Sequence, residues 1–217
     1  MNVKMKRYAK ALVAFVLALA MVSEAWGGLS FVSEAETTGT SAQAETGIPA
    51  DAVAFPEKTK DEWAATTLPD GNNYTVSNER EFVSFARASR VLSFAGKTVY
   101  LASDFTYKGS AFAGIGTTSY AFEGTFDGMG HKIANLLVGS AGIFIYTNNA
   151  TIKNLVIDNA TMTGNTYDMK GVLVTKAYGE NSLIDGVTIQ NTTTMNVKSA
   201  RCAILVGYAE DKFPIQN

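Results

Sequence analysis

The chain has 217 residues, of which 47% are apolar and 18% charged, and its formal net charge at pH 7 is −2. A single cysteine, Cys202, excludes an intramolecular disulfide and a cysteine-rich metal centre, and a single histidine, His131, excludes a multi-histidine metal site. Because basic and acidic residues nearly balance, we expect a folded protein that does not bind nucleic acid.

The N-terminus has the pattern of a secretory signal peptide. A basic stretch that ends at Lys10 is followed by the uncharged apolar run Ala11–Val22. This run is shorter than the roughly 20 residues of a membrane-spanning helix, and it has the length of a signal-peptide core. We expect residues 1–35 to be the signal peptide, with an uncleaved N-terminal anchor as the alternative. The mature chain is then secreted or displayed on the cell surface, without a membrane span.

Residues 36–73 are expected to form a flexible linker and a transitional segment. Thr, Ala, Glu, Gly and Ser dominate the first part of this stretch, and its apolar residues show no period. Beyond Gly96, Thr and Asn become frequent and short β-branched runs alternate with turn residues, which is typical of strands. We therefore expect one β-rich domain over residues 74–217.

A capping helix is expected at the start of this domain, near residues 79–90. Asn78 can cap the first turn, and Glu81 can reach back to the cap nitrogen. Phe82 and Phe85 fall on one helical face, so this face can cover an apolar surface.

The β-rich part repeats itself. Residues 153–174 align without a gap on residues 185–206, which predicts that Ile157 stacks on Ile189 and Val174 on Val206.

A second alignment places residues 133–138 on residues 152–157. It predicts that Val138 stacks on Ile157 and Asn135 on Asn154, where asparagine tolerates the left-handed backbone of a turn.

Repeats of this kind predict an all-β fold, a parallel β-helix in which short strands stack into continuous apolar columns. A strand of four or five residues cannot bury its own apolar face, whereas a column of stacked strands can. The alternative is a β-sandwich with accidental internal similarity. Because nothing after the last repeat has the pattern of a cap, we expect the native protein to continue past Asn217.

Phe122–Asn135 (FEGTFDGMGHKIAN) resembles a coil of bacterial exported right-handed β-helix proteins that carry the GLUG repeat. The resemblance extends from about Tyr74 to Ala209. It implies a right-handed solenoid and a surface-exposed, adhesin-like role. An enzyme of the same fold, a polysaccharide lyase or glycoside hydrolase, is the alternative function.

Asp127 and His131 are the candidate catalytic residues if the chain is an enzyme. They are near neighbours in sequence, and some polysaccharide-cleaving β-helix proteins use a histidine element with a cluster of aspartates. Acid–base cleavage of a glycosidic bond needs two carboxylates about 5–9.5 Å apart, and the spacing of the acidic residues does not predict such a pair. We therefore expect Asp127 and Gly130 to build a tight turn and His131 to lie at an exposed strand edge.

Binding, rather than catalysis, is the expected function, with a polysaccharide or another cell-surface ligand as the partner. Aromatic rings in turns or at strand ends can stack on a sugar, although they can equally pack over neighbouring strands. No calcium-loop or other metal motif is present, so no metal or cofactor is expected. The candidate binding residues are Tyr120, Tyr146, Tyr167, Tyr178 and Tyr208.

Overall fold

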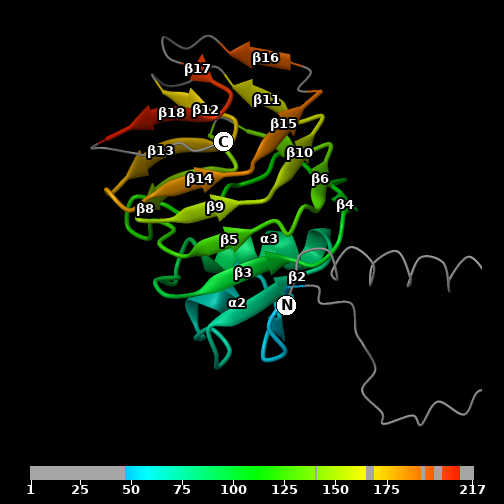
Figure 1. Ribbon diagram of the computed structural model, residues 1–217, viewed down its shortest axis with the longest axis vertical. Coiled ribbons are helices and arrows are strands. Elements are labelled where there is room, and N and C mark those ends of the chain that lie inside the picture. Colours follow the sequence, from blue (N-terminus) through cyan, green and yellow to red (C-terminus); the bar gives the residue numbers. More distant parts are fainter. Residues whose placement is uncertain (1–46, 140, 165–168, 192–193, 198–201, 211–217) are drawn as a thin grey trace, which may run out of the picture. The chain divides into compact units, whose positions relative to one another are not determined.

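The computed structural model describes residues 47–139, 141–164, 169–191, 194–197 and 202–210, which belong to one compact unit, Ala44–Asn217. The predicted signal peptide and its cleavage point lie outside the described residues, as does Tyr167. Within these ranges the chain consists mostly of short strands in parallel sheets, with the helices α2 (Lys60–Ala64) and α3 (Glu79–Ala88) near one end (Figure 1).

Every strand pairing among the described residues is parallel, and the strands gather into five sheets. The six-stranded sheet has the order β1 (Val53–Ala54), β2 (Asn73–Val76), β3 (Thr98–Leu101), β5 (Thr125–Asp127), β9 (Thr151–Lys153) and β14 (Leu183–Asp185). The four-stranded sheet has the order β15 (Thr188–Gln190), β10 (Val156–Asp158), β6 (Lys132–Ala134) and β4 (Phe105–Thr106).

Three smaller sheets follow the same pattern. Two contain three strands each, in the orders β16 (Thr194–Val197), β11 (Thr161–Gly164), β7 (Leu137–Val138) and β18 (Val206–Ala209), β13 (Val174–Tyr178), β8 (Phe144–Asn148). The last pairs β12 (Lys170–Gly171) with β17 (Cys202–Ala203). Parallel pairing of strands that recur along the chain confirms the all-β, parallel part of the predicted fold.

The register confirms the first predicted alignment at most strands but not at β11, where Thr161 pairs with Thr194 and Met162 with Met195, one residue beyond the predicted partners. Ile157 pairs with Ile189, and Val174 pairs with Val206. The connection that precedes β16 is one residue longer than the one that precedes β11, and the connection that follows β16 is one residue shorter than the one that follows β11. The two differences cancel, so the sequence still shows a gapless similarity although the register shifts locally.

The second predicted alignment is wrong. Ile157 pairs with Ile133 instead of Val138, and Asn159 Nδ2 donates a 2.8 Å hydrogen bond to Asn135 Oδ1. Both asparagines adopt a left-handed backbone, with φ of 54° and 59°. Asn154 has the same backbone conformation, so the sequence pattern around Asn135 fits either partner and does not identify the correct one.

The side chains between the sheets form one apolar core, and α3 covers its first layers. Phe82 stacks on Phe112 with ring centroids 4.9 Å apart, and Phe85 stacks on Phe126 with centroids 5.8 Å apart. Phe82, Phe85 and Phe126 are all fully buried. Each such side chain contributes about 1.5–3 kcal/mol relative to exposure, so the predicted covering face is confirmed as part of the core.

The first turn of α3 is capped close to the predicted way. The Asn78 side chain accepts hydrogen bonds from the backbone nitrogens of Arg80 and Glu81. The Glu81 carboxylate reaches one residue further back than predicted and accepts from the Ser77 nitrogen at 2.6 Å. The helix ends at Ala88.

A segment that was expected to be linker packs against α3. The buried ring of Trp63 in α2 donates a 2.9 Å hydrogen bond from Nε1 to Ser84 Oγ. Ser84 also donates to the Pro56 carbonyl oxygen at 2.6 Å and accepts from the Lys58 nitrogen at 2.8 Å. This buried hydroxyl joins residues 56–63 to the helix, and the compact unit therefore includes part of the stretch 36–73.

Replacing Phe82 and Phe85 together with Asp should uncover the first layers of the core. Two unpaired carboxylates cannot be buried among the phenylalanine rings, so we expect a marked fall in thermal stability and in soluble yield. Thermal unfolding followed by circular dichroism measures the first effect. Arg80→Asp, in the exposed first turn of the same helix, is the control, and equal melting temperatures for the double variant and this control would contradict the covering role of α3.

Candidate functional site

Three of the predicted tyrosines form one row on the outside of the sheet that contains β8, β13 and β18. Tyr146 and Tyr178 stack with parallel rings, 6.3 Å between centroids and 2° between planes. The Tyr208 ring lies next to Tyr178, with 6.4 Å between centroids and an angle of 60° between the ring planes. The three rings are half-buried, whereas the alternating residues Thr147 and Ala177 are buried, so the rings lie on the outer face of the sheet. We call these three residues the tyrosine row.

Register explains how residues so far apart in sequence meet. Lys176 in β13 pairs with Tyr146 on one side and Tyr208 on the other, while Tyr178 pairs with Asn148. Each ring therefore has a polar side chain beside it on the neighbouring strand. The Lys176 ammonium also lies 5.4 Å from the centroid of the Tyr146 ring, within the range of a cation–π contact.

The Tyr178 hydroxyl remains protonated at neutral pH. Partial burial raises the pKa of this phenol above 10.0, and the nearby Lys176 ammonium only partly opposes that shift. A protonated phenol both donates and accepts hydrogen bonds, which suits it to a hydroxyl-rich ligand.

A hollow of about 370 Å³ adjoins the tyrosine row. The loop that carries the exposed ring of Tyr120 forms one of its walls. Asn148 contributes an amide whose Nδ2 donates to Glu123 Oε1 at 2.9 Å. The residues that line the hollow are Thr118, Ala121, Tyr146, Asn148 and Tyr178. Two tyrosines, a threonine and an asparagine thus surround one open space.

Asp127 lies at a different place, on the six-stranded sheet, and is already surrounded by partners. Its side chain is 7% exposed, and the Lys153 ammonium lies 3.1 Å from Oδ2. Its Oδ1 accepts hydrogen bonds from the Met129 nitrogen and from Asn154 Nδ2, both at 3.0 Å. The tight turn expected here is present, since Met129 and Gly130 have φ of 52° and 78°.

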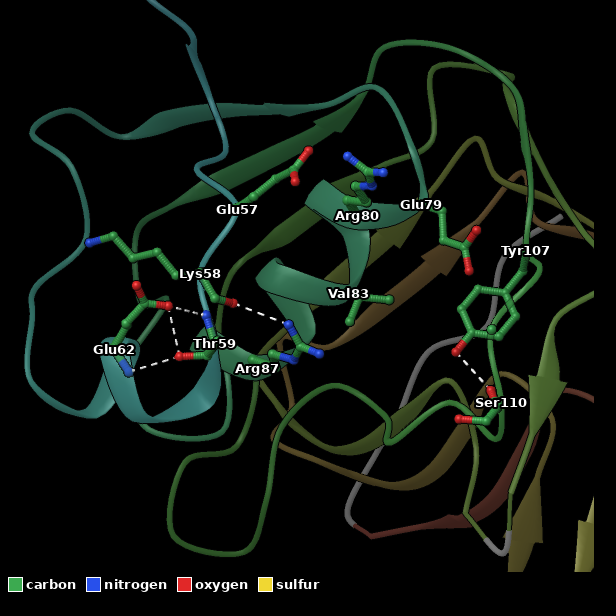
Figure 2. Close-up of a pocket in the computed structure, with 11 residues that line it drawn as sticks. Glu57, Lys58, Thr59, Glu62, Glu79, Arg80, Val83, Arg87, Tyr107 and Ser110 are labelled. Atoms are coloured by element: carbon green, nitrogen blue, oxygen red, sulfur yellow. Dashed lines mark hydrogen bonds between the residues drawn. The ribbon is translucent and has the colours of Figure 1, made fainter.

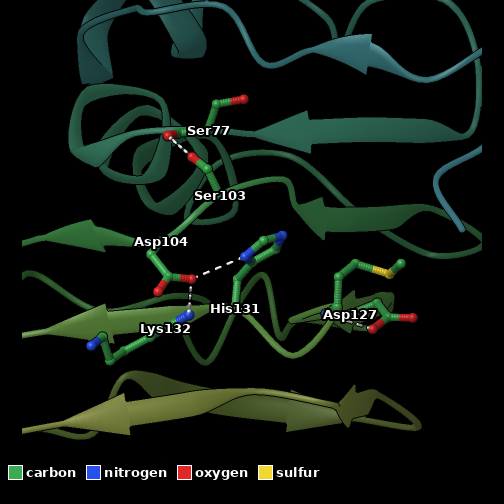
Figure 3. Close-up of polar contacts among 7 residues, drawn as sticks. Ser77, Ser103, Asp104, Asp127, His131 and Lys132 are labelled. Carbon is green, nitrogen blue, oxygen red and sulfur yellow. Dashed lines mark hydrogen bonds and ion pairs between the residues drawn. The ribbon is translucent and has the colours of Figure 1, made fainter. Parts of the chain in front are cut away.

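His131 pairs with another carboxylate. Its Nδ1 lies 2.9 Å from Asp104 Oδ1, and the same oxygen accepts from the Lys132 nitrogen at 3.0 Å (Figure 3). These two hydrogen bonds hold the pKa of Asp104 below its usual value, and the bond from the Lys132 backbone has the larger effect. Asp104 thereby ties the segment before β4 to the start of β6.

A hollow of about 470 Å³ beside Asp127 carries one carboxylate among its described lining residues, Asp127 itself. Hydrolysis of a glycosidic bond uses two carboxyl groups, one on each side of the bond. The arrangement therefore suits a structural turn better than a pair of acid–base catalysts.

A third hollow, of about 580 Å³, lies between residues 57–62, α3 and the loop at Tyr107–Ser110 (Figure 2). Two of its charged side chains already have hydrogen-bond partners in the protein. Glu62 accepts from the Thr59 nitrogen at 2.7 Å, and Arg87 donates to the Lys58 carbonyl oxygen at 3.3 Å. Burial, and secondarily the charge of Glu79, raise the pKa of Tyr107, whose hydroxyl donates to the Ser110 carbonyl oxygen. Three basic and three acidic residues line this hollow, Lys58, Arg80, Arg87, Glu57, Glu62 and Glu79, so it offers no net charge to a ligand.

Sequence reasoning named the tyrosines but missed Lys176, Asn148 and Thr118. Lys176 and Asn148 alternate with buried residues on the strands that carry the tyrosines, so the period of two was a usable signal for them. Thr118 lies in an irregular loop, and no sequence period places it.

Substituting Asp104 by Asn should weaken the link between the segment before β4 and β6. The folded-state pKa of Asp104 is lowered, so its contribution to stability is present above its ordinary pKa and is lost as the pH falls through the folded value. Because the carboxylate is exposed, we expect a fall in melting temperature of no more than about 2–4 °C at pH 7. The difference from wild type should vanish in strong acid.

The matched control is His131→Ala, which keeps the Lys132 backbone hydrogen bond to Asp104 and should cost less than Asp104→Asn. A wild type–variant difference in melting temperature that stays constant down to pH 2 would contradict the assignment.

No group of His, Cys, Asp or Glu within the described ranges is arranged to hold a metal ion. None of the helices in the same ranges is long and apolar enough to cross a membrane. Comparison of the chain with protein-family models, with curated proteins and with solved structures finds no match.

Proposed function

We propose that this chain is an exported, surface-exposed parallel β-helix of the adhesin-like kind, which contacts carbohydrate through the tyrosine row. The β-helix is supported by the recurrence of equivalent residues in parallel register. Ile133, Ile157 and Ile189 occupy one position on three neighbouring strands, and the first two are fully buried. Side chains that repeat at one inward position are what a stacked solenoid needs in order to form a continuous core.

The observation that carries the functional part is the tyrosine row itself. A pyranose ring has an apolar face of C–H groups and an edge of hydroxyls, so it is recognised by an aromatic ring with hydrogen-bonding groups beside it. Tyr146, Tyr178 and Tyr208 supply the rings, and Lys176 and Asn148 supply the polar groups in register with them.

Export and surface display are supported by the sequence. The basic stretch, the apolar run Ala11–Val22 and the small residues after it have the order of a signal peptide. A chain with a single cysteine also suits an oxidising environment, because it cannot form mispaired internal disulfides.

The proposal is tested by binding of the full chain to a glycan array and to insoluble polysaccharides. Tyr146→Ala and Tyr178→Ala should each weaken binding by about tenfold, the loss expected for one aromatic contact. Tyr100→Ala is the matched control, because Tyr100 is half-buried on the outer face of another sheet, in β3. All variants should keep the wild-type circular dichroism spectrum.

Two outcomes would overturn the proposal. One is the absence of binding to every carbohydrate on the array. The other is release of reducing sugar ends that Asp127→Asn abolishes, which would favour polysaccharide cleavage at the Asp127 turn.

A further inference from the structure

We infer that the ligand of the tyrosine row is an extended, uncharged polysaccharide chain that runs across strands β8, β13 and β18, with successive sugar units on successive rings. This inference rests on the proposed function and specifies its substrate class.

The direction of the row carries the first step. Tyr146, Tyr178 and Tyr208 come from three successive strands of one sheet, which lie side by side at one edge of the molecule (Figure 1). The two centroid separations, 6.3 and 6.4 Å, are nearly equal and exceed the strand spacing of about 4.8 Å. They exceed it because Tyr178 is displaced along its strand, so the row crosses the sheet as a zigzag.

A single sugar covers one ring of this size, and only a chain can contact all three. Once one unit is bound, the next ring meets a unit that is already held nearby at high effective concentration. Affinity should therefore rise steeply with the number of linked units until the row is filled.

The polar side chains beside the rings carry the second step. Lys176 lies in register between Tyr146 and Tyr208, and Asn148 lies in register with Tyr178. Tyrosine rings and polar side chains therefore alternate both from strand to strand and along β8 and β13. A polymer of linked pyranoses presents the same alternation of C–H faces and hydroxyl edges along its length.

The hollow extends the row on the side of Tyr146. Thr118 and Ala121 line it together with Tyr146, Asn148 and Tyr178. The loop therefore adds contacts beside Tyr146 and Tyr178 that Tyr208, which does not line the hollow, lacks. We place the end of the bound chain, or its most tightly held unit, at this position.

The charges around the row select against a polyanion. Lys176 supplies one positive charge. The carboxylate of Glu123 accepts from Asn148, and Glu210 lies close enough to Tyr178 to act on it electrostatically. Among the described residues at the row, two carboxylates against one ammonium repel a chain that carries a carboxylate on every unit, whereas hydroxyls can hydrogen-bond to all three groups.

Isothermal titration of the full chain tests the inference with defined probes. These are the hexasaccharides and disaccharides of β-1,4-linked glucose, mannose and N-acetylglucosamine, with hexagalacturonate as the polyanion. We expect an uncharged hexasaccharide to bind at least about tenfold more tightly than its disaccharide, with little dependence on salt. Hexagalacturonate should bind more weakly than the best uncharged hexasaccharide.

Tyr208→Ala tests the direction of the chain, because Tyr208 lies at the end of the row away from the hollow. This variant should bind the hexasaccharide about tenfold more weakly and the disaccharide with unchanged affinity, whereas Tyr146→Ala should bind both more weakly. Tyr100→Ala again serves as the control for a lost tyrosine elsewhere.

Failure of the inference and failure of the proposed function give different results. Three results would overturn the inference that the ligand is an extended, uncharged chain. They are equal affinities for disaccharide and hexasaccharide, an unchanged hexasaccharide affinity in Tyr208→Ala, and tighter binding of hexagalacturonate that added salt abolishes. The proposed function would survive each of those results. No binding of any of these probes by a chain that does bind a carbohydrate on the array would overturn the inference alone, whereas no binding on the array would overturn both.

Discussion

Parallel, in-register pairing of short strands is the constraint on which the rest of this structure depends. Because side chains alternate between the two faces of a strand, one register fixes both what is buried and what is displayed. The same pairing that places Ile157 between Ile133 and Ile189 in the core of one sheet places Lys176 between Tyr146 and Tyr208 on the outside of another. The core and the proposed binding surface are thus two results of one arrangement.

Such an arrangement leaves apolar residues uncovered wherever the layers stop, and α3 meets this need at the β1 end. The rings of Phe82 and Phe85 do not simply shield the strands, since they stack on Phe112 and Phe126 and so become part of the core. The hydrogen bonds of the buried Ser84 hydroxyl then attach residues 56–63 to the other side of the helix. Helix α3 therefore packs against the strand core through its phenylalanine rings and holds residues 56–63 through Ser84.

The parts of the fold that the sequence predicted are those encoded locally or by gapless repetition. Asn78 and the phenylalanine face of the helix could be identified because a cap and a helical period occupy a few consecutive residues. The partner of Asn135 could not, because Asn154 and Asn159 both lie two residues after an isoleucine and both adopt the left-handed turn. The tyrosines were named as separate candidates, but their alignment depends on turn lengths, which propensity does not determine.

One loop gives the site a freedom that the strands lack. The connection from β4 to β5 is held to the core by Phe112, Ile115 and Phe122, each of which forms an isolated parallel bridge to a residue on a later strand. Between the last two anchors, Thr118 and Ala121 line the hollow without pairing to any sheet. Substitution at those two positions would alter the shape of the hollow and leave the strand register untouched. In the function that we propose, ligand specificity could therefore change through this loop at little cost to folding, since its lining residues are separate from the strands that build the scaffold.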